Sequence, residues 1–294
     1  NYLSPTPSMA IAELQPDSSK GDISNGFVVP RGTMMDSQTL KKSGITCSYA
    51  TAHDVTLQPV RIAAVELGGI PADIPLASLG LQHSGCVSAL RIRLECYESV
   101  TLNNLQLDQL MFYLAGPDMQ AQQLLEGFAA DQALLPNDLR NFEGYRLLQE
   151  YFAFPARFQF FSVNGLRPLL QSVREGKKAL RQFEIVVLLD RHDAALERVV
   201  DAAHLALHCT PVINLFPKVA ERIAINEKNH EYHLVVDNIR PLDYEVFSVQ
   251  RLGGSASEKR YEQEFRPFYS TLSADDGNYG AYFSLRREQR TLSE

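Results

Sequence analysis

Tryptophan is absent from this 294-residue sequence, and cysteine is rare. The four cysteines, Cys47, Cys86, Cys96 and Cys209, stand far apart and form no C-x-x-C pair. This spacing excludes a disulfide-rich scaffold and a zinc ribbon, both of which need clustered cysteines. We therefore expect reduced, mostly buried thiols. The lack of tryptophan also disfavours a carbohydrate- or host-binding β-sandwich module, because such modules present exposed aromatic platforms.

The sequence also lacks a surplus of basic residues and a long apolar run. The formal net charge is −7 and the isoelectric point is near 5.6, whereas surfaces that bind nucleic acid or anionic membranes need clustered lysine and arginine. No apolar stretch approaches the roughly 20 residues that span a bilayer. The opening NYLSPTPSM has no basic-then-apolar layout of a signal peptide. We expect an internal piece of a longer cytoplasmic protein that neither binds nucleic acid nor inserts directly into a membrane.

The composition is otherwise that of a globular protein, with 45 % hydrophobic and 21 % charged residues. The length predicts about two domains. In residues 1–130, short apolar segments alternate with turns rich in Gly, Pro and Asn, which is typical of a β-sandwich-like domain. The cleanest alternation is Val87–Tyr97, which places Leu90, Ile92, Leu94 and Cys96 on one face. Other predicted strands are Met9–Leu14, Ile45–Tyr49, Leu105–Leu114 and a pair around Pro59 within Val55–Val65. Phe27–Gly32 predicts a short strand that runs into a turn, Gly68–Gly69 predicts a loop, and a short helix is expected after Pro117.

The stretch Gly144–Phe161, GYRLLQEYFAFPARFQFF, is expected to organise the second domain. Its first half predicts a helix that ends before Pro155, because proline lacks an amide hydrogen and restricts the preceding residue. Its second half alternates like a half-buried strand. The residues expected to be buried are Tyr145, Leu147, Leu148, Tyr151, Phe152, Phe158 and Phe160, and those expected outside are Arg146, Gln149, Glu150, Arg157 and Gln159. This aromatic stretch is predicted to be packing core rather than a catalytic site.

Residues 131–294 as a whole are predicted to form an α+β domain around a mixed or antiparallel sheet. Phe183–Leu189, FEIVVLL, is a continuous apolar run typical of a central strand. Ala194–Leu207 has apolar residues at helical spacing, with Asp193 as its N-cap. Further strands are predicted at Val219–Ile225, Tyr232–Val236, Glu245–Val249 and Tyr282–Leu285, with a flexible loop at Gly253–Lys259. The expected fold class is α+β, dominated by β-structure.

The histidines are the strongest candidates for chemistry. His204 and His208 are four residues apart in the predicted helix, a spacing that can chelate a metal, but the glutamate of H-E-x-x-H is missing. His192 and Asp193 follow a predicted strand, a place where acid–base pairs occur, although a turn and helix cap is the commoner reading. An enzyme, either a hydrolase or a metal-binding protein that uses His192 or His204 and His208, is therefore the alternative to a non-catalytic protein.

Other chemical motifs are missing from the sequence. It contains no G-x-S-x-G, G-x-G-x-x-G or Walker loop. His230 and His233 would point to opposite faces of a strand, and Asp275–Asn278 lacks the ligand spacing of a calcium loop. We assign no catalytic, cofactor-binding or metal-binding residue from the sequence, and we expect no cofactor.

Several long composite motifs resemble one family. The segments YLSPTPSMAIAELQPD (Tyr2–Asp17), VVPRGT (Val28–Thr33) and DVTLQPV (Asp54–Val60) are followed by YRLLQEYFAFPARFQFF (Tyr145–Phe161), HCTPVINLFPKVAERI (His208–Ile223), PLDYEVFSV (Pro241–Val249) and FRPFY (Phe265–Tyr269). In this order they resemble TssF, also called VasA or ImpG, a baseplate component of the bacterial type VI secretion system. The resemblance covers nearly the whole chain, but the helical N-terminal region and a C-terminal portion of the family are missing. The link between Gln120 and Gly127 is shorter than the family pattern.

The resemblance implies a structural role without catalysis or cofactor. TssF-like proteins are expected to pair as two copies with one TssG in the wedge of the baseplate. The wedge would surround the VgrG spike hub and contact TssK and TssE, and the assembly would be cytoplasmic and docked at the inner membrane. An assembly protein of this kind needs rigid domains with exposed apolar patches rather than a cleft with perturbed titrating groups.

Overall fold

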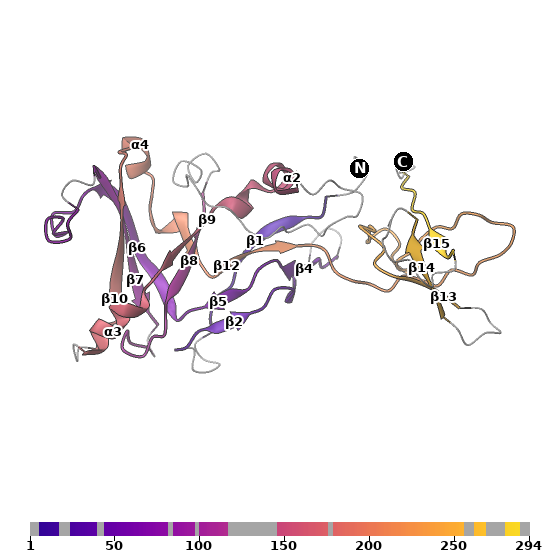
Figure 1. Ribbon diagram of the computed structural model, residues 1–294, viewed down its shortest axis with the longest axis horizontal. Helices are drawn as coiled ribbons and strands as arrows, with labels where there is room; N and C mark the ends of the chain where they lie inside the picture. The colour runs from indigo at the N-terminus through magenta and orange to yellow at the C-terminus, as the bar shows by residue number, and fades with distance from the viewer. Residues whose placement is uncertain are drawn as a thin grey trace.

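The computed structural model describes residues 6–17, 24–39, 44–81, 85–97, 100–116, 146–175, 179–255, 262–268 and 280–288. Strands dominate over helices in these residues and form several small sheets. The prediction of a β-dominated α+β fold is therefore confirmed. Figure 1 shows an elongated molecule, with β6, β7 and β10 at one end, β1, β12, β4, β5 and β2 in the middle, and β13, β14 and β15 at the other end.

The first sheet is antiparallel and has the order β10-β7-β6, with β6 at Val60–Gly69, β7 at Ser88–Cys96 and β10 at Gln182–Leu189. The alternation predicted for β7 is confirmed, because Leu90, Ile92, Leu94 and Cys96 are all buried. Two expectations are wrong. β10 lies at an edge of the sheet that the described residues form, rather than at its centre. Gly68–Gly69 lies at the end of β6, where it pairs with Ala89 and Ser88, rather than in a loop.

The second sheet has the order β11-β8-β9, with β8 at Gln109–Leu114, β9 at Phe160–Asn164 and β11 at Leu205–Leu207. It faces the first sheet across the main core. Leu170 of helix α3 (Arg167–Glu175) joins this core. Each fully buried aliphatic or aromatic side chain contributes about 1.5–3 kcal/mol. The most deeply buried members, with no exposed surface, are Ile92, Leu94, Leu105 and Phe112.

The middle of the molecule contains a four-stranded sheet of order β1-β12-β4-β3. Its strands are β1 (Met9–Glu13), β12 (Cys209–Ile213), β4 (Ser48–Thr51) and β3 (Met34–Asp36). Beside it, β2 (Phe27–Val29) pairs with β5 (Val55–Leu57). Strands from before residue 130 thus pair with strands from after it, as β1 does with β12 and β7 with β10. The predicted domain boundary at residues 130/131 itself lies outside the described residues.

The predicted helix Ala194–Leu207 is wrong. Asp193 caps α4 as expected, but α4 is one short turn at Ala194–Glu197. Asp201 then starts a separate 3-10 helix, η4, at Ala202–His204, and Leu205 enters β11. The apolar spacing is compatible with a helix, yet the pairing of Leu205–Leu207 with Leu114–Phe112 of β8 overrides that local preference.

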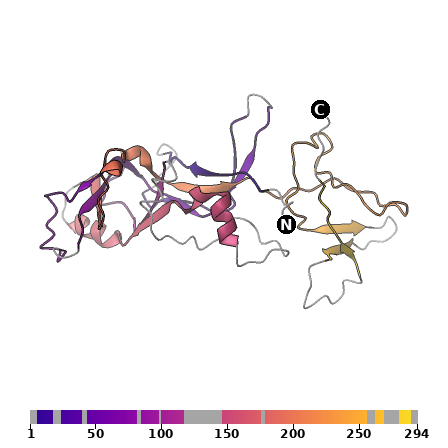
Figure 2. The same ribbon diagram turned by 90° about the horizontal axis from the view of Figure 1, so that it is seen from above.

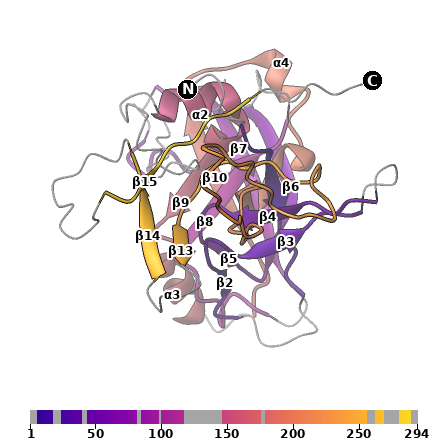
Figure 3. The ribbon, with the colours of Figure 1, turned by 90° about the vertical axis from the view of Figure 1, so that its right-hand side faces the viewer.

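The C-terminal part contains β13 (Leu252–Ser255), β14 (Glu262–Pro267) and β15 (Tyr282–Phe283). Figure 2 shows it, in orange and yellow, as a group at one end, and in Figure 3 β13 and β14 lie nearest the viewer. The strand predicted at Tyr282 is confirmed. The strands predicted at Val219–Ile225, Tyr232–Val236 and Glu245–Val249 are wrong, and the loop predicted from Gly253 begins inside β13. The helix expected after Pro117 lies outside the described residues.

Candidate protein-interaction surface

Helix α2 spans Arg146–Ala153 and lies above β1 in Figure 1. The prediction that the helix ends before Pro155 is confirmed. The prediction of its buried face is wrong. The apolar side chains are exposed, with Leu147 at 48 %, Leu148 at 52 % and Phe152 at 77 %, and Tyr151 is also exposed. Among the described side chains of the helix, those of residues 147–153, only that of Glu150 is fully buried. The sequence pattern is amphipathic, but its apolar side faces outward.

The reason for this inversion is a buried ion pair. Proline at the first position starts a short 3-10 helix, η3, at Pro155–Phe158 directly after α2. This turn brings the Arg157 guanidinium onto the Glu150 carboxylate, and neither side chain has exposed surface. The Arg157 guanidinium also lies 5.3 Å from the centre of the Phe158 ring. Because a buried charge must be paired, Glu150 turns inward and the apolar side chains of α2 turn outward.

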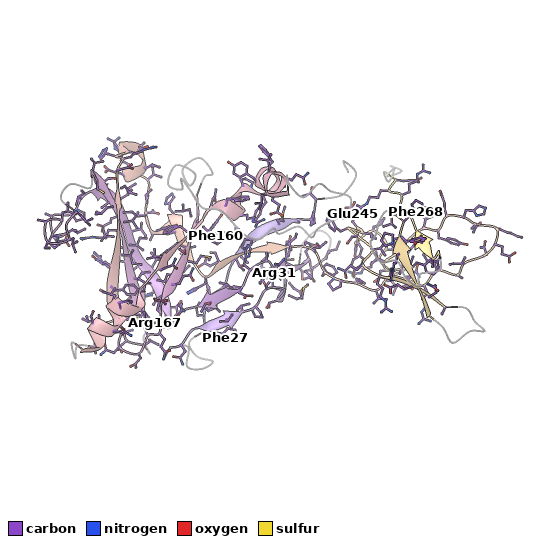
Figure 4. The ribbon with its side chains drawn as sticks, in the orientation of Figure 1. Phe27, Arg31, Phe160, Arg167, Glu245 and Phe268 are labelled. Carbon is purple, nitrogen blue, oxygen red and sulfur yellow. The ribbon has the colours of Figure 1, made fainter. Side chains whose placement is uncertain are left out.

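The strand that follows begins later than predicted. β9 starts at Phe160, so Arg157 and Gln159, expected to be outside, are the buried residues. Phe161 stacks on Phe112 with ring centroids 5.0 Å apart, and Phe160 lies 5.0 Å from the ring of Tyr113. Figure 4 labels Phe160 beside the central strands. The aromatic residues after Pro155 therefore anchor α2 to β8, which keeps its apolar side in a defined orientation.

A second apolar surface lies in residues 216–244, which have little regular structure. The backbone N–H of Glu221 donates to the carbonyl of Val235, and Lys218 pairs with Asp237 at 3.1 Å. The Asn226 side chain accepts from the backbone N–H groups of Lys228 and Asn229, which forms the turn. Two of the predicted strands therefore lie opposite each other without a full ladder. The strongly exposed apolar side chains here are Val219, Ile225, Ile239 and Leu242.

The histidines singled out from the sequence lie in three separate arrangements. His192 pairs with Glu197 at 3.1 Å on the surface. His204 ends η4 and pairs with Asp201 at 2.8 Å, completing a capping box. His208 lies in a buried turn between β11 and β12 with φ 57°, so it shares no helical face with His204. The described residues hold no group of three or more His, Cys, Asp or Glu side chains that could bind a metal.

The imidazole of His208 and the thiols of Cys96 and Cys209 are buried and neutral at physiological pH. Burial lowers the pKa of His208 from 6.5 to about 4. The neutral Nε2 accepts a hydrogen bond from the Gln58 backbone N–H (3.0 Å). Burial raises the pKa of the Cys96 thiol to about 11 and that of Cys209 to about 12. These thiols are poor nucleophiles at neutral pH, since the thiolate is the reactive form. The expectation of mostly buried thiols holds for Cys96 and Cys209, while Cys47 and Cys86 are half-buried.

One cavity of about 240 Å³ opens at the junction of β5, the start of β8 and the His208 turn. Its lining combines apolar walls with acceptors. The sequence singled out His208 only as a metal ligand and gave no signal for this cavity, because its residues come from three distant segments. They are Asp54, Val55, Thr56, Gln58, Asp108, Gln109, Leu110, Met111, His208 and Cys209.

Comparison with known proteins decides the family. The family model described as "Type VI secretion system, TssF" matches residues 1–126 and 125–294, which together make up the whole chain. The chain belongs to the TssF family. The resemblance read from the sequence motifs is therefore confirmed. The two matched segments meet near the link for which the motifs indicated a shorter sequence, and that link lies outside the described residues.

Two relatives of known identity support this assignment. The type VI secretion system component TssF1 of Pseudomonas aeruginosa is 39 % identical over 326 residues, covering 100 % of this chain and 51 % of the relative. A chain in the cryo-electron microscopy structure of the type VI secretion system TssK-TssF-TssG baseplate subcomplex matches with a TM-score of 0.68 and 27 % identity, covering 92 % of this chain and 52 % of that chain. This chain thus spans about half the length of each of the two chains that it matches. Among the described residues, no helix is long and apolar enough to cross a membrane.

Proposed function

We propose that this chain is part of a non-catalytic structural subunit of the type VI secretion baseplate wedge and assembles with TssG. The observation that carries the proposal is α2, whose apolar side chains are exposed while its buried contact is an ion pair. A helix with this orientation offers a ready face for a partner, since apolar area removed from water stabilises a complex by about 25 cal/mol per Å². The solved TssK-TssF-TssG subcomplex supports TssG and TssK as the partners.

The shape of the molecule is consistent with this role. The sheets in its centre pair strands from distant parts of the chain, and apolar side chains are exposed on α2, on β2 and in residues 216–244. Exposed apolar patches on a folded protein commonly mark interaction sites. In the wedge, the chain would also meet a second copy of TssF, TssE and the VgrG hub, within a cytoplasmic assembly docked at the inner membrane.

The alternative, a hydrolase or metal-binding enzyme, has little support from the geometry. It requires His192, or His204 and His208, to converge with a nucleophile, a carboxylate or another ligand. Each of these histidines instead has a local structural partner: Glu197, Asp201 and the Gln58 backbone, respectively. His192 thus forms a surface pair, His204 caps a 3-10 helix, and His208 is a buried hydrogen-bond acceptor.

Co-purification tests the proposal. The full-length protein should be co-expressed with TssG and TssK, and the eluted complex analysed by size-exclusion chromatography. We expect one complex containing all three proteins, unchanged by His192→Ala. A full-length protein that elutes alone under conditions in which TssG and TssK are both folded would contradict the proposed function. Loss of a measurable hydrolytic activity in His192→Ala, with assembly intact, would favour the enzyme.

A further inference from the structure

The C-terminal group of the structure, described over residues 214–255, 262–268 and 280–288, contains no buried residue within those ranges. The last buried residue along the described chain is Ile213, at the end of β12. The main core ends earlier still, because its most C-terminal buried member is Leu207. Figure 1 shows the group at one end of the molecule, and Figure 4 labels Glu245 and Phe268 within it. The group therefore has strands and turns without a core of its own.

Strong exposure of aliphatic side chains accompanies this lack of a core. Val219 is 92 % exposed and Ile239 is 90 % exposed. The other exposed aliphatic side chains of the group are Ile223, Ile225 and Leu242. Burial of such side chains is favourable in proportion to the apolar area that leaves water, and a large exposed apolar patch marks an interaction site. The group thus presents a surface that another stretch of polypeptide covers.

The same surface carries a strand pattern without forming a strand. Val219, Ile223 and Ile225 stand an even number of positions apart, which is the pattern of one face of a half-buried strand. The residues between β12 and β13, all of which the structure describes, nevertheless contain no helix or strand. The Glu221 N–H donates to the Val235 carbonyl at 2.9 Å, so the two segments lie opposite each other. Pattern and partial pairing together indicate a sheet that is completed by a further strand.

The contrast with α2 indicates which kind of polypeptide covers the group. The apolar side chains of α2 are also exposed, but Phe161 stacks on Phe112 and joins this part of the chain to the main core. Such a surface is folded before its partner binds. The C-terminal group needs its cover in order to fold, because a unit that buries little apolar surface does not offset the conformational entropy of folding. A cover within the same polypeptide meets this need, since a linked segment has a high effective concentration.

We propose that the part of the full-length protein outside these 294 residues covers this group and completes it as a β-rich domain. Length supports this occupant, since the chain spans 51 % of TssF1 and 52 % of the matched chain in the solved subcomplex. The cover packs apolar side chains on Val219, Ile225 and Ile239 and pairs a strand with residues 219–225. In this arrangement the apolar side chains of residues 216–244 contact the protein's own chain, whereas α2 remains available to TssG.

Hydrogen exchange measured by mass spectrometry on the full-length protein alone tests the proposal. The peptide with residues 219–225 reports on the cover, and peptides from β7 show that the protein is folded, since β7 lies in the main core. The variants are Val219→Asp and Ile239→Asp. The matched control is His230→Asp, because His230 is an exposed residue of the same segment and also gains one negative charge. Measurement at two protein concentrations separates a cover within the chain from a second copy, because only association between copies depends on concentration.

We expect the amides of residues 219–225 to exchange at least about a hundredfold more slowly than in an unstructured peptide, at both concentrations. Val219→Asp and Ile239→Asp should speed this exchange at least about tenfold, while His230→Asp should leave it unchanged. Fast exchange in the folded wild type would overturn the proposal. Protection that both apolar variants leave intact, or that appears only at the higher concentration, would overturn it as well. TssG is absent from this experiment, so the outcome is independent of the proposed function.

Discussion

The ion pair of Glu150 and Arg157 is predicted to determine how α2 is held. Both side chains are fully buried, so removing one partner leaves the other charge in a site that water cannot reach. Breaking a buried pair in this way costs about 3–5 kcal/mol, whereas replacing both partners by apolar residues of similar volume is often neutral or stabilising. We therefore expect Arg157→Met to lower the free energy of unfolding by about 3–5 kcal/mol. That is a large part of the roughly 5–15 kcal/mol that stabilises a typical domain.

Urea denaturation followed by circular dichroism measures this effect in a double-mutant cycle. Glu150→Leu alone should be comparably destabilising, and the double variant Glu150→Leu with Arg157→Met should recover most of the loss. The recovery isolates the pairing from the change in packing against Phe158. Single variants within about 0.5 kcal/mol of the wild type, the usual range for surface changes, would refute the reasoning. Additive losses in the double variant would show that each side chain is stabilised by other contacts.

Three further predictions concern stability. Because burial lowers the pKa of His208 from 6.5 to about 4, the unfolded chain binds more protons than the folded chain between these values, and the native state should lose about 2 kcal/mol between pH 7 and pH 5 through this group. His208→Asn, which suits the φ of 57°, should lose less over that range in urea titrations; an equal loss would contradict the assignment. Phe112→Ala should lower the free energy of unfolding by about 3–5 kcal/mol, because Phe112 is fully buried. Phe268 is exposed at the far end in Figure 4, so Phe268→Ala should lower it by under about 0.5 kcal/mol. Similar urea midpoints for the two variants would contradict this difference in burial. Gly26→Ala should lower the free energy of unfolding more than Gly44→Ala does. Both glycines have positive φ, but only at Gly26 would an added Cβ lie 3.0 Å from the Gln58 amide. The reverse order would contradict this close contact.

The sequence predicted those elements whose burial follows from their own pattern. The alternation in β7 identifies its buried residues because one face packs against the core. The end of α2 at Pro155 follows from the missing amide hydrogen of proline. The N-cap at Asp193 is likewise a local signal, since its carboxylate accepts from the N–H groups of Ala195 and Leu196.

The features that the sequence did not predict depend on distant residues or on partners. The helical pattern of α2 identifies two sides, but it does not tell which side faces the protein when a partner covers the apolar one. Residues Leu205–Leu207 have helical spacing, yet β8 supplies strand partners from about ninety positions earlier in the chain. The cavity with Gln58 combines three separate segments. Long-range pairing of this kind leaves no local signature.

The central claim is that the outward side of α2 binds a partner of the baseplate. The most direct measurement is the dissociation constant between the full-length protein and TssG co-assembled with TssK, comparing Phe152→Asp and Leu148→Asp with Gln149→Asp. Gln149 is an exposed polar residue of the same helix outside the apolar stripe, so it controls for the effect of aspartate on the helix. We predict that the first two variants bind at least tenfold more weakly and that Gln149→Asp binds like the wild type. Wild-type affinity for both apolar variants, in proteins with unchanged circular dichroism, would contradict the account.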